Sequence, residues 1–168
     1  MAAPDRSATA ASASRSRARP WPQVSIARSV RDAAVPSIRE LRRWAAAALG
    51  RAAAGREISV LIVGSARSRA LNRRYRGRDK PTNVLSFPAM TGAAGATLGD
   101  LVICPPILRR EARSQGKSQR AHWMHLYVHG LLHLAGFDHE RPADARRMEQ
   151  REIRVLRGLG VANPYRSH

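Results

Sequence analysis

The sequence predicts a single α+β domain in which a small mixed β-sheet is covered by helices. The chain has 168 residues, about the length of one domain. Hydrophobic residues make up 43% and charged residues 25% of it, which is close to globular averages and argues against a fibrous or wholly disordered chain. Segments with the pattern of strands are interspersed with segments of helical spacing, an order typical of α+β domains.

The first two expected elements are a strand and a helix. A short alternating segment around residues 24–26 predicts the strand. Ser37 and Glu40 form the Ser-x-x-Glu signature of a capping box, and apolar residues then recur at helical spacing up to Gly50. We therefore expect an amphipathic helix over residues 38–49.

A second strand and helix are expected next, followed by two strands that pair with each other. The β-branched run at residues 58–63 predicts a buried strand, and Ser65 is the expected cap of a helix that runs through Tyr75. Residues 82–87 lie between two prolines, which predicts a short strand near a sheet edge. After a flexible loop of small residues, residues 98–104 predict a strand antiparallel to the previous one.

Three helices are expected in the rest of the chain. Prolines at the start and a glycine at the end predict a helix from Pro105 to just before Gly116. Ser118 is the expected cap of the next helix, which runs to about Ala135. The last helix is expected over residues 142–156, before a pair of glycines.

The net charge of the chain is its most unusual global property. Lysine and arginine together number 30, against 12 acidic residues, which gives a net charge of +18, and 28 of the 30 cations are arginine. An excess of this size favours an acidic partner such as nucleic acid. A basic surface that binds nothing is the alternative.

The N-terminal segment and the single cysteine bear on the domain boundary and on the cellular compartment. Residues 1–22 are rich in alanine, serine and arginine, and we expect a disordered basic tail rather than an organellar transit peptide, with the folded domain over residues 23–168. Cys104 is the single cysteine and cannot form an internal disulfide, which fits a reducing cytoplasm. No apolar stretch is long enough to predict a membrane span or a secretory signal.

Five of the six histidines fall between residues 122 and 139. His129 and His133 are four residues apart, so on a helix both imidazoles project from one face. Gly136 can adopt a left-handed turn that ends the helix and brings His139 back to the same ion. Three neutral imidazoles suit one Zn²⁺ per chain and leave a fourth position open, so the sequence predicts a zinc-hydrolase-like domain.

Three polar residues near these histidines have two possible roles each. His122 and His125 lie on the same helical stripe and either support the ligands or substrate, or pack against neighbouring elements. Asp138 either orients a ligand imidazole or bonds the backbone of the turn.

The spacing of the three histidines also matches the ligands of metzincin proteases. Those enzymes place a glutamate directly after the first histidine as the general base, and here that residue is Gly130. A metal-dependent hydrolase of the metalloprotease type, acting on peptides or small molecules, is therefore a weakened alternative.

Residues 129–139 read His-Gly-Leu-Leu-His-Leu-Ala-Gly-Phe-Asp-His, and together with two further blocks and the C-terminal end they resemble the YbeY family of bacterial endoribonucleases. The stretch from His129 to His139 follows the family's signature at every defining position. The resemblance covers roughly residues 24–165 in family order. The other segments that carry it are Leu71-Asn72 with Tyr75-Arg76, Asp79-Lys80-Pro81-Thr82-Asn83-Val84-Leu85-Ser86-Phe87-Pro88, Leu98-Gly99-Asp100-Leu101-Val102-Ile103-Cys104 and Asn163-Pro164-Tyr165.

The resemblance implies an activity, a site and a set of partners. The implied reaction is zinc-dependent cleavage of single-stranded RNA in the 3′-end processing of small-subunit ribosomal RNA and in ribosome quality control. The implied zinc ligands are His129, His133 and His139, and Arg76 and His129 are the catalytic candidates. The implied partners are the ribosomal RNA precursor and the small ribosomal subunit, with a ribosomal protein and a ribosome-associated GTPase.

Two points stay open at this stage. Either water or the 2′-hydroxyl of the RNA can serve as the nucleophile. The chain can also be a non-enzymatic ribosome assembly factor with a structural zinc, for which a fourth ligand such as His168 would have to close the site.

Overall fold

A computed structural model describes residues 21–90 and 97–165 of the chain. The tail predicted over residues 1–22 lies almost wholly outside these residues, as do most of the loop predicted before the strand at residue 98 and the histidine at residue 168. At the start of the described chain, the Trp21 carbonyl accepts a hydrogen bond from Gly55 N at 3.2 Å, and Pro22 is buried. Residues 21 and 22 therefore contact the rest of the described chain.

The centre of the fold is a four-stranded mixed sheet, as predicted. Its strand order is β1-β2-β4-β3; β1 and β2 are parallel, β2 and β4 are parallel, and β3 is antiparallel to β4. The predicted antiparallel pair and the predicted edge position of β3 are both confirmed. The strands are β1 (Gln23–Arg28), β2 (Glu57–Ile62), β3 (Val84–Pro88) and β4 (Thr97–Ile103).

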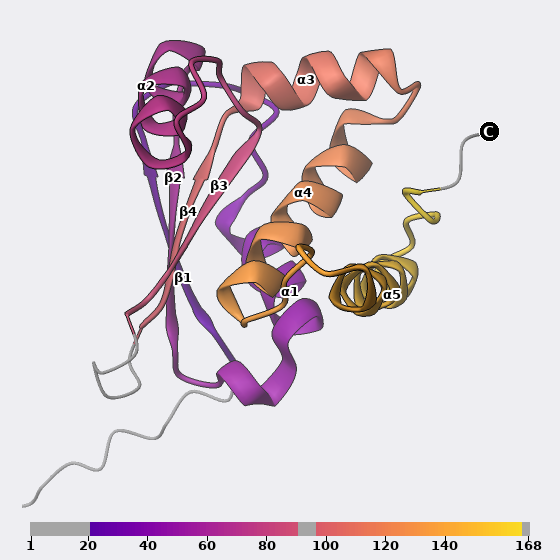
Figure 1. Ribbon diagram of the computed structural model, residues 1–168. Helices are drawn as coiled ribbons and strands as arrows, with labels where there is room; N and C mark the ends of the chain where they lie inside the picture. The colour runs from indigo at the N-terminus through magenta and orange to yellow at the C-terminus, as the bar shows by residue number, and fades with distance from the viewer. Residues whose placement is uncertain (1–20, 91–96, 166–168) are drawn as a thin grey trace, which may run out of the picture.

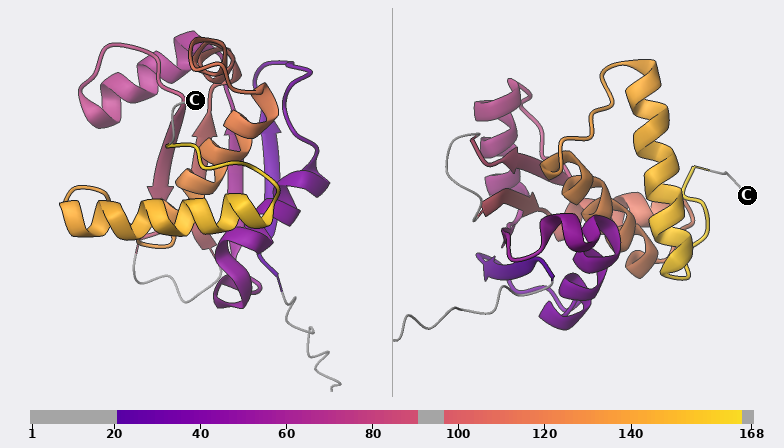
Figure 2. Two further views of the ribbon diagram at one scale, coloured as in Figure 1. Left: turned by 90° about the vertical axis from the view of Figure 1, so that its right-hand side faces the viewer. Right: turned by 90° about the horizontal axis from the view of Figure 1, so that it is seen from below.

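All five predicted helices are present, and they cover the sheet unequally. Figure 1 shows α2 on one face of the sheet, whereas α1 and α4 lie against the other face and α5 packs outside α4. Seen from the helical side, α5 lies across α4 (Figure 2, left). The helices are α1 (Ile38–Leu49), α2 (Ser65–Arg76), α3 (Pro105–Ser114), α4 (Gln119–Leu134) and α5 (Pro142–Gly158), with a 3₁₀ turn (Gly50–Ala53) after α1.

The core lies between the sheet and the layer of α1 and α4. Trp44 of α1 and Trp123 and Tyr127 of α4 are completely buried there, and the Trp44 and Tyr127 rings pack with centroids 6.2 Å apart. A smaller apolar cluster, which includes Leu85 and Val102, lies under α2 on the other face. This division follows from the alternation of side chains along each strand.

Helix α4 is buried between the sheet, α1 and α5 and packs closely on the sheet at Gly130. A Cβ atom at this position would stand 2.9 Å from Leu101 Cδ2 and 3.3 Å from Val84 Cγ2. The glycine therefore allows the close approach of α4 to β3 and β4, and the position faces the sheet.

Helix starts confirm two of the three predicted serine caps. Ser37 and Glu40 form the complete capping box, and the Ser118 side chain accepts a hydrogen bond from Ala121 N. The predicted cap at Ser65 is wrong, because Ser65 is already the first helical residue and the extended Gly64 precedes it without a side-chain bond. The structure has no described helix that is long and apolar enough to cross a membrane.

Strand boundaries differ from the predicted ones by one or two residues. The strand predicted from residue 82 begins at Val84, because Thr82 exchanges hydrogen bonds with the Ser68 side chain of α2 (2.7 and 2.9 Å) rather than with the sheet. The helix predicted to stop at Gly50 continues as the 3₁₀ turn.

Candidate metal centre

Three histidines from the end of α4 and the turn after it converge on one point, as the sequence predicts. One ring nitrogen from each of His129, His133 and His139 lies within 4.8 Å of the other two. His129 and His133 are on the same face of α4, one turn apart. Gly136 has a φ of 89° and ends the helix, so that the chain turns back and carries His139 to the other two.

The distances between the ring nitrogens fit a common cation. His129 Nε2 lies 3.1 Å from His133 Nε2, which lies 3.0 Å from His139 Nδ1. In a tetrahedral zinc site with Zn–N bonds of ~2.0–2.1 Å, neighbouring ligand nitrogens are roughly 3.3 Å apart. The three imidazoles therefore need only a small adjustment to hold one ion, and an all-nitrogen set of this kind suits zinc.

The opposite nitrogens of two ligands have partners that fix the tautomer. His133 Nδ1 lies 3.0 Å from the Phe137 carbonyl oxygen, which can only accept, so this nitrogen carries the proton. His129 Nδ1 lies 2.6 Å from Glu152 Oε1 and likewise donates to it. Both Nε2 atoms are thereby left with a lone pair directed at the point where the three rings meet.

The surroundings of His133 keep its imidazole neutral, the state that metal binding requires. Burial lowers the pKa of His133 to about 4, and the neighbouring His129 and His139 act in the same direction. At neutral pH this imidazole is neutral, and only a neutral imidazole offers a lone pair to a metal.

A carboxylate that the sequence analysis missed, Glu152 of α5, supports the ligands from behind. Its side chain is completely buried, and besides His129 it accepts hydrogen bonds from His125 Nε2 at 3.1 Å and from the Tyr165 hydroxyl. Burial raises the pKa of Glu152, but the hydrogen bonds from His125, His129 and Tyr165 outweigh it and hold the pKa at about 2. Glu152 is therefore an anion inside the protein.

A sequence signal for Glu152 exists. Met148, Glu152, Val155 and Leu156 are the buried residues of α5 and follow helical spacing, so an acidic residue stands within an apolar stripe. A buried carboxylate requires partners, and the nearby histidines are the natural candidates.

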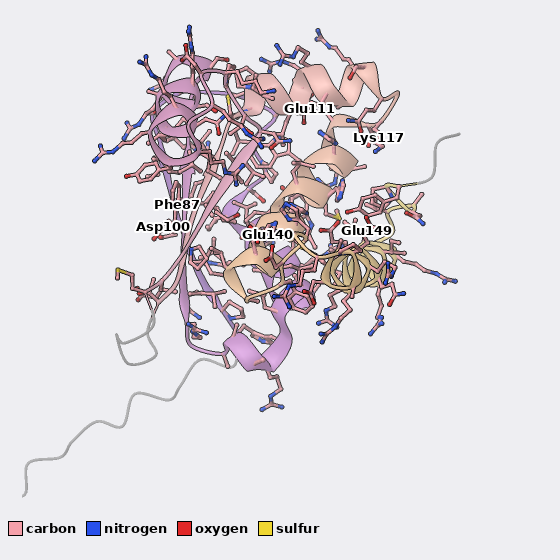
Figure 3. All side chains as sticks on the ribbon, viewed as in Figure 1. Phe87, Asp100, Glu111, Lys117, Glu140 and Glu149 are labelled. Carbon is pink, nitrogen blue, oxygen red and sulfur yellow. The ribbon has the colours of Figure 1, made fainter. Side chains whose placement is uncertain are left out.

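The structure shows what His122, His125 and Asp138 contact, which the sequence left open. His122 is 3% exposed, and its Nε2 lies 2.9 Å from Oε2 of Glu111 on α3, the residue labelled in Figure 3. His125 Nε2 contacts Glu152, which also binds His129, and the His125 and His129 ring centroids are 6.5 Å apart. Asp138 Oδ1 accepts from the backbone nitrogens of His139 and Glu140 at 2.6 and 3.2 Å, which is the turn-bonding role.

Arg76 is not brought into contact with the histidines. It is the last residue of α2, and within the described residues its guanidinium makes no hydrogen bond or ion pair. Partial burial, and to a lesser extent the charge of Arg78, lower the pKa of Arg76. A partly desolvated cation without an acidic partner is well suited to bind an anion, but its role in a reaction stays a prediction.

Comparisons with known proteins point to one family. The family model of Endoribonuclease YbeY matches residues 27–160. A curated Endoribonuclease YbeY of Halorhodospira halophila is 50% identical over 141 residues, which cover 81% of this chain and 92% of that protein. A second, from Methylococcus capsulatus, is 53% identical over 135 residues, or 79% of this chain and 89% of that protein.

The fold is also similar to that of a solved structure. The solution structure of a Thermotoga maritima protein matches 86% of this chain and 99% of its own, with a TM-score of 0.58 and 22% sequence identity. At this identity the likeness supports the α+β fold alone.

Proposed function

The chain belongs to the YbeY family of endoribonucleases, and from this premise we propose that it cuts single-stranded RNA with a zinc ion held by His129, His133 and His139. We infer this activity from the name of its relatives, whose sequences are about 50% identical to this chain over most of their length. The observation that carries the proposal is the convergence of three imidazole nitrogens whose opposite atoms are already bonded.

The donor set supports zinc in a catalytic setting. Imidazole nitrogen is a ligand that zinc prefers, and three protein ligands are typical of catalytic zinc sites, whereas structural sites have four. Among the described residues, the group that could hold a metal contains these three histidines and no fourth side chain. This favours an enzyme over an assembly factor with a purely structural zinc.

The chain's own residues supply the rest of the proposed chemistry. A bound zinc would supply Lewis-acid stabilisation of the negative charge that develops on the phosphate oxygens. Arg76 would bind a phosphate oxygen pair with its planar guanidinium, because no acidic residue in the described part of the chain is paired with it. Glu152 keeps the proton on His129 Nδ1, so that His129 contributes to catalysis as a ligand.

The geometry at Gly130 counts against the peptidase alternative. A metzincin glutamate at this position would have to fit where even a Cβ stands 2.9 Å from Leu101, a completely buried residue. The site therefore lacks the carboxylate base of those proteases and has no room for one there.

RNA and the ribosome are the proposed substrate and setting. The net charge of +18 favours binding to a polyanion. We include the ribosomal RNA precursor, the small ribosomal subunit, a ribosomal protein and a ribosome-associated GTPase among the proposed partners, in the cytoplasm. These partners rest on the family resemblance.

A comparison of substrates tests the proposal. Purified protein, reconstituted with zinc and separately treated with a chelator, is given single-stranded RNA, the same RNA annealed to its complement, and a peptide library. We expect metal-dependent cleavage of the single strand only. Cleavage of peptides, or cleavage of RNA that does not depend on metal, would contradict the proposed function. In cells that lack the protein, unprocessed 3′ ends of small-subunit ribosomal RNA should accumulate.

A further inference from the structure

Tyr75, in the last turn of α2, is a large aromatic residue whose exposure the fold does not explain. It is 55% exposed, and no described residue is hydrogen-bonded to its hydroxyl. Three other large apolar or aromatic residues are exposed, but Tyr165 is bonded to Glu152, and Trp21 and Met90 adjoin segments outside the described residues. Within the described part of the chain, Tyr75 is thus a large aromatic residue that leaves more than half of its surface open to solvent and has no hydrogen bond to account for that position.

The Tyr75 ring is held in place by Phe87 of the outer strand β3. The two ring centroids are 5.0 Å apart and the rings meet edge to face at 70°. Phe87 is itself partly buried and packs against the apolar cluster under α2. Because the ring is already positioned, a ligand that stacks on it loses little free energy in ordering this side chain.

The surroundings of Tyr75 are strongly basic. Helix α2 contains five arginines and no acidic residue, and the Arg74 guanidinium lies over the Tyr75 ring, 5.4 Å from its centroid. The nearby Asp79 is already paired with Arg69 at 2.7 Å. Asp100 of the inner strand β4 stands opposite Phe87 in the strand register, so both side chains lie on the face of the sheet that α2 covers, and Figure 3 labels the two together. The arginines of α2 therefore attract a polyanion, whereas Asp100, on the next strand inward, repels it.

We propose that Tyr75, supported by Phe87, is a stacking site for one unpaired base of an RNA strand whose phosphates lie along the arginines of α2. This rests on the proposed function and adds to it a substrate contact. A positioned aromatic face among cations is the chemistry by which proteins bind single-stranded nucleic acid, and Arg74 adds a cation on the same ring. A protein or membrane partner would need a larger apolar patch than one ring provides.

The location of this stacking site connects it with the metal centre. Ser86, directly before Phe87, points to the other face of β3, where its hydroxyl donates to the Gly130 carbonyl at 3.4 Å beside the ligand His129. Among the strands of the described residues, β3 is at the edge of the sheet, next to β4 alone. An RNA strand that crosses this edge passes from the face of the sheet covered by α4, with the three histidines, to the face with Tyr75. The stacked base would therefore determine the distance along the RNA between that base and the cut.

A binding experiment with abasic nucleotides tests the proposal. Fluorescence anisotropy measures the affinity of the metal-loaded protein for a short 2′-O-methyl RNA strand and for the same strand without bases, with gels to verify that the strands stay intact. Tyr75→Ala should lower the affinity for the intact strand by ~5- to 100-fold, the range expected for one stacked base. It should leave the affinity for the abasic strand and the salt dependence unchanged. Tyr75→Phe should behave as wild type, and Trp21→Ala is the matched control at another exposed aromatic residue.

Two results would overturn the proposal, and they are distinguishable from each other. If Tyr75→Ala binds both strands as wild type does, or weakens both equally, Tyr75 does not stack on a base, although the proposed endoribonuclease function stands. If the wild-type protein neither binds nor cleaves any single-stranded RNA, the proposed function falls and this inference falls with it.

Discussion

His129 and Glu152 are joined by a hydrogen bond of 2.6 Å between Nδ1 and Oε1, which connects a candidate metal ligand on α4 to a completely buried carboxylate on α5. The bond orients the imidazole and leaves its Nε2 free for the ion. The carboxylate holds His125 and Tyr165 as well, so four side chains from α4, α5 and the C-terminal segment form one network. Metal affinity should therefore depend on residues that never touch the metal.

The first prediction concerns Glu152. Glu152→Gln keeps the shape of the side chain but loses the acceptor charge, so the dissociation constant for zinc should rise by ~10- to 100-fold. Competition with a chromogenic chelator measures it. The matched control is Glu149→Gln, which removes an exposed charge from the same helix and should leave zinc affinity unchanged. Equal zinc affinity in the two variants would contradict the role of Glu152.

The second prediction concerns the C-terminal Asn163-Pro164-Tyr165 segment. Lys117 Nζ donates to the Pro164 carbonyl at 2.8 Å, and the Tyr165 hydroxyl donates to Glu152. Tyr165→Phe removes one of three donors from the buried carboxylate and should weaken zinc binding several-fold, less than Glu152→Gln. Isothermal titration with zinc measures this effect, with Tyr75→Phe as the control. A drop in melting temperature with unchanged zinc affinity would show that the segment only stabilises the fold.

The third prediction concerns the close approach of α4 to the sheet. Gly130→Ala gains helix propensity of ~1 kcal/mol, but its Cβ would collide with the buried Leu101, and overpacking costs ~1–3 kcal/mol. The free energy of unfolding should therefore fall, as measured by urea denaturation. Gly158→Ala, at a helical position with open space, should leave it unchanged or raise it slightly. A stabilised Gly130→Ala would show that the sheet yields there and that the position could accept a side chain.

The fourth prediction concerns Arg76. Arg76→Ala should lower single-turnover RNA cleavage by ~10²–10³-fold while zinc content and melting temperature stay at wild-type values, because the role proposed for the guanidinium is to bind phosphate and not the metal. Arg76→Lys should recover part of the rate, since an ammonium cannot make the bidentate contact. Arg42→Ala, which removes an exposed arginine of α1 outside the proposed RNA contact, is the control. Cleavage at the same rate in Arg76→Ala and Arg42→Ala would reduce Arg76 to a surface charge.

Local rules made most of the fold and the ligand set predictable. The i,i+4 spacing of His129 and His133 and the turn at Gly136 place three imidazoles together without knowledge of the rest of the fold. The capping box at Ser37 is equally local. These features depend on contacts between residues close in sequence.

What the sequence analysis missed depends on tertiary contacts. Glu152 follows His129 by 23 positions, and only the packing of α5 on α4 brings the two together. Thr82 falls outside the sheet because Ser68, on another element, binds its backbone. Gly64 is the N-cap of α2 and Ser65 is its first helical residue. The preference of serine for the N-cap position alone therefore gave the wrong cap.

The zinc content of His139→Ala tests the central claim most directly. His139 is the candidate ligand that the turn, and not helix periodicity, brings to the other two histidines, and its loss would remove one of the three candidate ligands. Elemental analysis of the purified protein should find one zinc per chain in the wild type and in His122→Ala, a histidine of α4 outside the cluster. It should find most of the zinc absent from His139→Ala. A full equivalent of zinc in folded His139→Ala would contradict the three-histidine metal centre.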